Sequence, residues 1–104
     1  MAGLGKFLKQ AQKMQEQMTK VQDDLAKREV EGTSGGGAVK AIATCDGSIK
    51  SVKLDPKVVD PNDVEMLEDL IVGAVTNALE VAKKTQTDEM NKVTAGMSLP
   101  GMGM

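Results

Sequence analysis

A run of apolar residues between Leu4 and Arg28 constrains the fold of this chain more than any other feature. Its members follow one another at alternating steps of three and four residues: Leu4, Phe7, Ala11, Met14, Met18, Val21 and Leu25. This is the 3.5-residue repeat of a coiled-coil seam, not the two-residue alternation of a strand, so it predicts one long helix. At 1.5 Å per residue the helix is roughly 37 Å long, whereas a compact domain of this size has a radius of gyration of about 13 Å. The helix must therefore project or lie against a second long helix.

Lysines recur every seven residues along one flank of this seam, at Lys6, Lys13, Lys20 and Lys27, with Lys9 close by. In the second half of the helix, acidic residues lie three or four positions from the basic ones, a spacing that predicts internal ion pairs. These residues are Lys13, Glu16, Lys20, Asp23, Asp24, Lys27 and Arg28. No acidic residue precedes Glu16, so Lys6 and Lys9 are expected to stay unpaired at a helix N-terminus, where the macrodipole adds partial positive charge. That end should attract anions.

The composition predicts one small domain with a sparse core. The chain has 104 residues, Phe7 is its only aromatic residue, and it has no Trp or Tyr. A monomer would have little core per residue, and oligomerisation is the natural remedy. The single Cys45 excludes an internal disulfide, and without His we expect no zinc or transition-metal site and no cofactor. With no His or Tyr, and a lone Cys in a predicted strand, catalysis and a small-molecule substrate are not expected.

Targeting signals are not expected either. Charged residues come too early for the apolar region of a signal peptide, and no apolar run approaches the roughly 18–20 residues needed to span a bilayer. We therefore expect a soluble, cytoplasmic protein that does not bind membranes.

The net charge of −2 argues against a nucleic-acid binder, but the charges are unevenly distributed. Residues 1–15 contain three lysines and no acid, a net charge of +3. Residues 55–80 contain seven acids and one lysine, a net charge of −6. The sequence therefore predicts a basic end and a strongly acidic interior segment.

The middle of the chain reads as a three-stranded antiparallel sheet with strands at 29–34, 38–45 and 48–54. The flexible run 34–37 suits the first turn, Asp46-Gly47 is a two-residue hairpin signal, and Asp55-Pro56 ends the last strand. A phosphate-binding loop at Gly35-Gly36-Gly37 is disfavoured, because the Gly-Lys-Ser/Thr ending and the following helix are missing. Such a sheet leaves two edges that a second copy could cover.

A second long helix is predicted from a start signal at Asp60-Pro61-Asn62-Asp63, with Pro in the first turn, to about Val93. Its wide apolar face comprises Val64, Leu67, Leu70, Ile71, Ala74, Val75, Ala78, Leu79 and Ala82. We expect one domain over residues 1–94 and a disordered Gly/Met-rich tail over 95–104. The fold class is α+β, an α-β-β-β-α protomer.

Two such helices most simply pack side by side and antiparallel. This packing would bring six lysines together at the end distant from the sheet, as candidate DNA contacts: Lys6, Lys9, Lys13, Lys83, Lys84 and Lys92. The acidic segment from Asp60 to Asp69 would lie at the other end. A homodimer joined through the sheets, with the predicted interface at Gly35, Gly36, Gly37, Val39, Ala41 and Ala43, would present two basic arms around a gap.

Four stretches, in the right order and covering nearly the whole chain, resemble the YbaB/EbfC family of bacterial nucleoid-associated proteins. They are Lys9-Gln10-Ala11-Gln12-Lys13-Met14-Gln15, Ser34-Gly35-Gly36-Gly37-Ala38-Val39-Lys40, Glu65-Met66-Leu67-Glu68-Asp69-Leu70 and Gly96-Met97-Ser98-Leu99-Pro100. The resemblance implies an α-β-β-β-α protomer and a tweezer-like homodimer whose arms grip double-stranded DNA. It also implies a role at the nucleoid, in its organisation and in gene regulation.

Two functions follow from the residues. In the first, a dimer binds duplex DNA mainly through backbone phosphates, since a chain with one aromatic residue cannot stack bases as single-strand binders do. In the second, the heptad seam with Met14 and Met18 forms a groove for a partner helix, and the lysines only keep the arms in solution.

Overall fold

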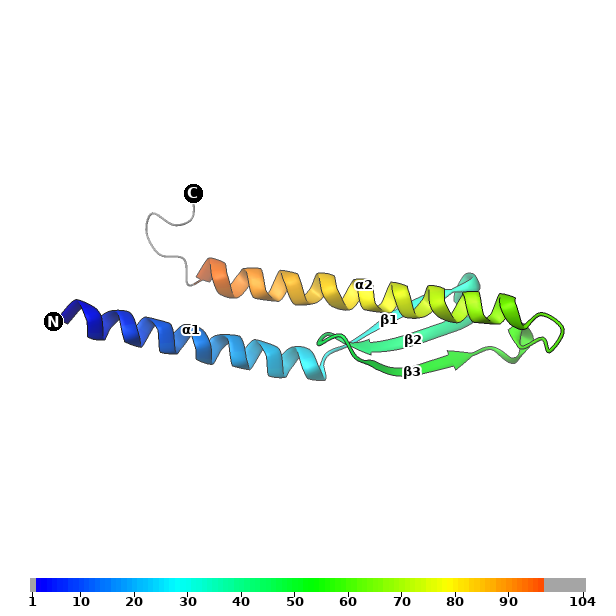
Figure 1. Ribbon diagram of the computed structural model, residues 1–104, viewed down its shortest axis with the longest axis horizontal. Helices are drawn as coiled ribbons and strands as arrows, with labels where there is room; N and C mark the ends of the chain where they lie inside the picture. The colour runs from blue at the N-terminus through cyan, green and yellow to red at the C-terminus, as the bar shows by residue number, and fades with distance from the viewer. Residues whose placement is uncertain (1, 97–104) are drawn as a thin grey trace.

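The computed structural model describes the backbone of residues 2–96 and the side chains of residues 3–93. Five main elements follow one another: α1 (Ala2–Lys27), β1 (Glu29–Ser34), β2 (Val39–Thr44), β3 (Ile49–Leu54) and α2 (Val64–Gly96). Short 3₁₀ turns span Gly35–Gly37 and Pro56–Val58. The predicted α+β class and α-β-β-β-α order are confirmed (Figure 1). Helix α2 continues over residues 95 and 96 of the predicted tail, and residues 97–104 of that tail lie outside the described residues.

The sheet is antiparallel with the order β1-β2-β3, so β2 is central and β1 and β3 are its edges. The turn between β2 and β3 is longer than the predicted two residues and comprises residues 45–48. The reason lies at Cys45, whose amide donates to the carbonyl oxygens of Leu25 at 3.0 Å and Arg28 at 2.9 Å. This amide satisfies one C-terminal carbonyl of α1, that of Leu25, and one of the residue after the helix, so it ties the hairpin to the end of α1.

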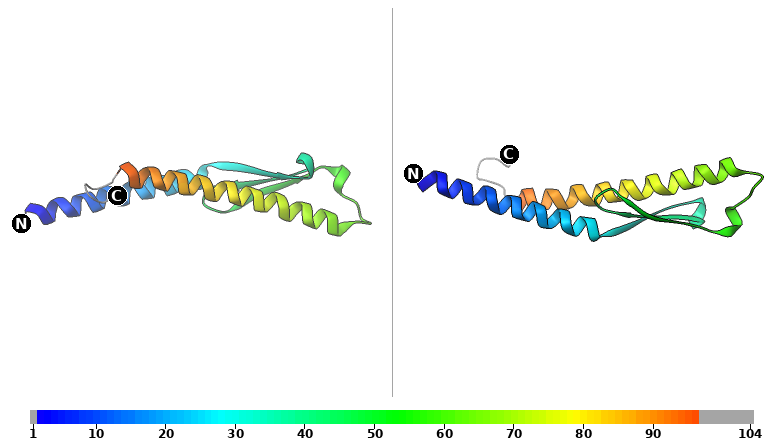
Figure 2. Two further views of the ribbon diagram at one scale, coloured as in Figure 1. Left: turned by 90° about the horizontal axis from the view of Figure 1, so that it is seen from above. Right: turned by 60° about the horizontal axis from the view of Figure 1, so that its bottom comes forward.

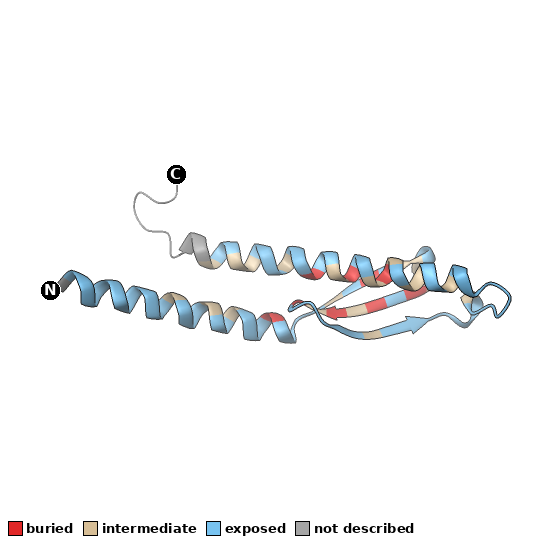
Figure 3. Ribbon diagram, viewed as in Figure 1, coloured by how far each residue is buried: buried red, intermediate tan, exposed pale blue. Residues whose placement is uncertain are grey.

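Helix α2 covers the part of the sheet formed by β1 and β2, and the core lies between them (Figure 3). Ala74, Ala78 and Ala82 recur every four residues and are at most 1% exposed. They pack against β2 residues that alternate along the strand, Val39, Ala41 and Ala43, all fully buried. Small side chains on the facing surfaces allow a close approach of helix and strand.

The closest approach is at Gly32 of β1. A Cβ atom added there would lie 2.1 Å from the backbone nitrogen of Ala78 and 2.4 Å from the carbonyl oxygen of Ala74. Both neighbours are backbone atoms of α2, which cannot move aside as a flexible side chain can. The distance between β1 and α2 therefore requires glycine at this position.

The start of α2 differs from the prediction. Asp63 is the residue that caps the helix, because its carboxylate accepts from the amide of Met66 at 3.3 Å. The carboxylate of Asp60 accepts from the amide of Asn62 at 2.9 Å and forms a separate turn before the helix. Pro61 consequently lies in that turn and not in the first turn of α2.

The molecule is an elongated rod of 73 × 25 × 16 Å with a radius of gyration of 20.1 Å. The two helices run antiparallel, and the C-terminal end of α2 lies beside the middle of α1 (Figures 1 and 2). The first half of α1 extends beyond α2 in every view. Both sequence alternatives for a long helix are thus realised, since α1 packs at one end and projects at the other.

Arg28 and Glu89 join the two helices where they meet. The guanidinium of Arg28 lies 3.2 Å from the carboxylate of Glu89 and 3.3 Å from that of Asp24, and Lys92 lies 3.3 Å from Glu89. Of the ion pairs predicted along α1, Arg28–Asp24 is formed, whereas Lys13, Lys20 and Lys27 form none with residues that the structure describes. These three lysines extend from an exposed helix surface, where an ion pair gains little.

We expect Gly32→Ala to lower the free energy of unfolding by about 3 kcal/mol, because the added methyl group forces the backbones of β1 and α2 apart. Urea denaturation at fixed protein concentration measures this change. The matched control is Gly5→Ala, at a helical position with no atom within 4 Å of the added Cβ. It should leave stability unchanged or raise it by up to about 1 kcal/mol. Equal stabilities of the two variants would contradict the close approach.

We expect the pKa of Glu89 to lie below its usual range, because Lys92 and then Arg28 donate hydrogen bonds to its charged form. Lys92→Met should raise this pKa most and Arg28→Met less, as measured by a carbon-13 NMR titration of the Glu89 carboxyl group. Lys84→Met, which removes a lysine outside the Glu89 pairs, is the control.

A depressed pKa of Glu89 stabilises the fold above the unfolded-state pKa, and this contribution to stability disappears as the pH falls through the folded-state pKa. The stability difference between the wild type and Glu89→Gln should therefore vanish in acid.

Candidate nucleic-acid interface

The projecting half of α1 carries positive charge with no acidic residue to neutralise it. Lys6, Lys9 and Lys13 are all exposed there, and none forms an ion pair within residues 2–96. The first turn of α1 contains no acidic residue, so the partial positive charge of the helix N-terminus adds to that of the lysines. The predicted basic end is thus present as an exposed arm.

The lysines and the apolar seam lie on different faces of this arm. At 100° per residue, Lys6, Lys9 and Lys13 are about 120° to 180° around the helix axis from the line of Phe7 and Ala11. Farther along the helix, the seam side is the side that is covered: Met14, Met18 and Val21 are half-buried and Leu25 is buried. The lysine face is therefore directed away from α2 and open to a large ligand.

The lysines of α2 do not join this group. The ion pair between Arg28 and Glu89 holds that part of α2 near the C-terminal end of α1, and Lys6 lies 22 residues, or roughly 33 Å, before Arg28. Lys83 and Lys84 lie still farther toward the sheet, since they precede Glu89. The prediction that all six lysines lie together is therefore wrong for Lys83 and Lys84.

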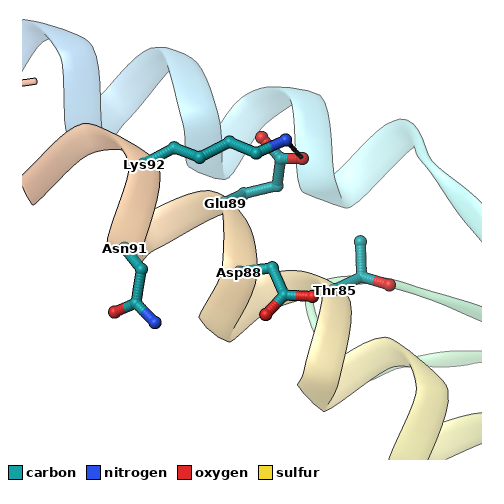
Figure 4. Close-up of a pocket in the computed structure, with 5 residues that line it drawn as sticks. All are labelled: Thr85, Asp88, Glu89, Asn91 and Lys92. Atoms are coloured by element: carbon teal, nitrogen blue, oxygen red, sulfur yellow. Dashed lines mark hydrogen bonds and ion pairs between the residues drawn. The ribbon is translucent and has the colours of Figure 1, made fainter. Parts of the chain in front are cut away.

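Lys92 is the lysine of α2 nearest to the arm, but its ammonium group is already paired with a carboxylate. Its side chain folds back to Glu89 on the side of α2 that faces α1, whereas Asn91 points away (Figure 4). These residues line a shallow pocket together with Thr85 and Asp88. Because Glu89 also binds Arg28, the pocket holds a compact charge network.

The predicted dimer interface falls on two different environments. Val39, Ala41 and Ala43 have 0% exposure beneath α2, so in this conformation their side chains are unavailable to a second copy. Gly35, Gly36 and Gly37 have φ angles of 61°, 70° and 94°, a left-handed conformation that suits glycine. Gly36 and Gly37 also have open space around them and stay candidate contacts.

Sequence reasoning missed an apolar row on the edge strand β3. Leu54 pairs with Val39 and Val52 with Ala41, so these side chains share the core face of the sheet. Yet Leu54, Val52 and Ile49 are 38%, 37% and 39% exposed, because α2 lies over the other two strands. The apolar residues at positions 49, 52 and 54 were visible in the sequence, but neither the register shift that brings Ile49 to this face nor the coverage by α2 could be read from it.

The acidic segment lies at the end of the molecule opposite the arm. Asp60 and Asp63 precede α2 and Glu65, Glu68 and Asp69 lie in its first two turns, beside the turn between β1 and β2 (Figure 1). Within the described residues, no three His, Cys, Asp or Glu side chains form a group suited to a metal ion. No described helix is both long and apolar enough to traverse a bilayer.

Comparisons with known proteins agree with this architecture. The chain is 46% identical over 99 residues to a nucleoid-associated protein of Caldanaerobacter subterraneus, covering 95% of this chain and 89% of that protein. It is 48% identical over 99 residues to one of Clostridium novyi, covering 95% and 87%. The fold is similar to the crystal structure of an uncharacterized protein from Helicobacter pylori, with a TM-score of 0.72 and 15% identity over 88% of this chain and 94% of that one.

The sequence model of the YbaB/EbfC DNA-binding family matches residues 1–97. The match spans the arm, the sheet and α2, which are the elements that form the candidate interface and its support. The chain belongs to the YbaB/EbfC DNA-binding family.

Proposed function

We propose that this protein is a nucleoid-associated protein whose homodimer grips double-stranded DNA, mainly through backbone phosphates, and so affects nucleoid organisation and gene expression. The observation that carries this proposal is the projecting arm of α1, with Lys6, Lys9 and Lys13 exposed and without acidic partners. The relatives named nucleoid-associated proteins support a location at the nucleoid, and the description of the family supports DNA as the ligand. The charges, the helix N-terminus and the exposure all favour a polyanion.

Phosphate contacts fix the position of a protein on DNA but carry no sequence information directly. Selectivity therefore depends on groups that reach base edges, and Gln10 and Gln12 on the same arm are the available ones, because glutamine can pair with adenine. Lys83 and Lys84 lie too far along α2 to share a phosphate with the arm. They are proposed as a second, separate contact to a longer stretch of duplex.

The homodimer is proposed to form through β3 and the uncovered apolar row beside it. An edge strand with Ile49, Val52 and Leu54 each more than a third exposed is a surface that a second copy can cover. The core of one chain is small, since its fully buried side chains are mostly alanine. Burying this row would extend the core across two chains and leave both α1 arms projecting.

The scaffold alternative is less favoured. Met14 and Met18, which were to line a groove for a partner helix, are half-buried where α1 lies beside α2 (Figure 1). The lysines of the arm are also placed away from the seam and not along it, where they would flank a bound helix. A phosphate backbone explains this placement better than a partner helix does.

We expect the logarithm of the DNA affinity to fall with the logarithm of salt concentration with a slope of about −5, since two arms with three lysines each contact about six phosphates. Fluorescence anisotropy with a random-sequence duplex measures this slope. Replacement of Lys6, Lys9 and Lys13 by Glu should abolish binding.

The matched control replaces Lys40, Lys53 and Lys57 by Glu, which changes the net charge equally on exposed positions of the sheet and its following turn. This control should retain most of the affinity. A flat salt dependence, or equal losses in the two triple variants, would contradict phosphate contact by the arm.

We expect Val52→Asp to convert the protein to a monomer, because the interface would have to bury an unpaired carboxylate. Light scattering coupled to size-exclusion chromatography gives the mass. Val72→Asp is the control, at a 64% exposed position on the outward side of α2. A dimer that survives Val52→Asp and also Leu54→Asp would place the interface elsewhere.

A further inference from the structure

Only the C-terminal half of the apolar seam of α1 is covered in the folded chain. Leu25 is 1% exposed, whereas Leu4, Phe7 and Leu8 on the arm are 63%, 62% and 56% exposed. The seam keeps the same spacing throughout, but α2 ends beside the middle of α1 (Figures 1 and 3). The exposed seam, defined here as Leu4, Phe7, Leu8 and Ala11, therefore continues a helix-packing surface beyond its partner helix.

The residues that flank the exposed seam are uncharged. In a coiled coil the flanking positions select the partner, since like charges there repel and opposite charges attract. Apart from the position of Leu8, which belongs to the seam, they are occupied along α1 by Gly3, Gln10, Gln15 and Gln17. Two identical helices can thus pair through this surface without repulsion at their contact edges. The lysines, on the other side of the helix, would stay outward.

The exposed seam is also self-complementary in size. In an antiparallel pair of identical helices that cross near residue 9, Phe7 of each helix faces Ala11 of the other. The large Phe7 of each copy then packs against the small Ala11 of the other, and the two-fold axis relates these two contacts. In the same register Leu4 faces Met14, which is half-buried.

We propose that the exposed seam is a self-association site at which the arm of a second copy docks, antiparallel, onto Leu4, Phe7, Leu8 and Ala11. A site of four residues per helix is small, so the contact is weak in free solution and forms readily when two arms are held at high effective concentration. Copies bound to one DNA molecule are held in this way, and this part of the inference rests on the proposed function. Paired arms present the lysines of the two copies on opposite outer faces.

Chemical crosslinking tests the contact with two reporter positions on the same arm. In a Cys45→Ala background, Gln10→Cys places a thiol at the edge of the exposed seam, about 80° from the line of Phe7 and Ala11, and Lys9→Cys places one on the opposite face, about 180° from that line. A short bismaleimide is added with long duplex DNA, and separately to concentrated protein without DNA. Gln10→Cys should give covalent dimers in both samples, and Lys9→Cys should give few in the concentrated free protein.

Variants of the seam complete the test. Phe7→Ser with Leu8→Ser should lower the Gln10→Cys crosslinking yield by about tenfold or more, because the buried apolar contact is lost. Affinity for a short duplex should be retained, since the lysines are untouched. Val72→Ser, at a comparably exposed valine of α2, should leave the yield unchanged. Equal yields from the two reporters, or a yield that ignores the seam variants, would overturn the proposal.

Two further outcomes are separable. If a chain ending at Gly96 crosslinks about tenfold more than the full chain, residues 97–104 occupy the seam and the second copy does not, which overturns the proposal. If the protein binds no duplex at all, the proposed function fails, but crosslinking of the concentrated free protein still decides whether the arms pair.

Discussion

The contact between the backbone of β1 at Gly32 and the backbone of α2 at Ala74 and Ala78 is the constraint on which the rest of the structure depends. It sets the height of α2 above the sheet, and the alanines that follow at Ala78 and Ala82 keep that height along the strands. Because α2 lies so close to β1 and β2, it cannot also cover β3. The apolar row on β3 is thus a direct consequence of tight packing elsewhere.

The same placement of α2 determines how much of α1 is free. Cys45 fixes the C-terminal end of α1 to the hairpin, and Arg28 ties it to Glu89. From that junction α2 has only a few turns left before Gly96, whereas α1 has its whole length. The arm is therefore the part of α1 that extends past the end of α2, because the sheet determines where the two helices meet. Its exposed lysines and exposed seam have one structural cause.

The order and type of the elements could be predicted from the sequence because they depend on local periodicity. The 3.5-residue seam, the turn signals that bound the strands and the carboxylates before α2 are properties of neighbouring residues. Relative position along two helices is not local. Lys83 and Lys84 were expected beside Lys6 on the basis of antiparallel packing alone, but the register comes from the Arg28–Glu89 contact and from the sheet. The arm itself was predictable, since the absence of acidic residues before Glu16 is visible in the chain.

The predicted interface at Val39, Ala41 and Ala43 shows a second limit. Alternating small apolar residues on a strand fit either a helix of the same chain or a second copy. The sequence alone therefore indicates which face of the strand is buried but not what covers it. Four-residue spacing of alanines on α2 favours the helix, because small residues on both surfaces permit close contact. The proposed interface with a second copy therefore uses the apolar surface that α2 leaves uncovered.

An acidic protein can serve as a DNA-binding protein when its charges are separated by more than the screening distance. The Debye length is about 10 Å at 0.1 M salt, whereas this molecule is 73 Å long. Under the proposed function, phosphates at the arm would be attracted by Lys6, Lys9 and Lys13 and little affected by Asp60, Glu65 or Asp69 at the far end. The acidic end would repel DNA from that end of the sheet, which favours approach along the arm. Net charge is thus a poor guide to DNA binding by an elongated chain. The elongation itself arises because the seam of α1 extends past the end of its partner helix α2.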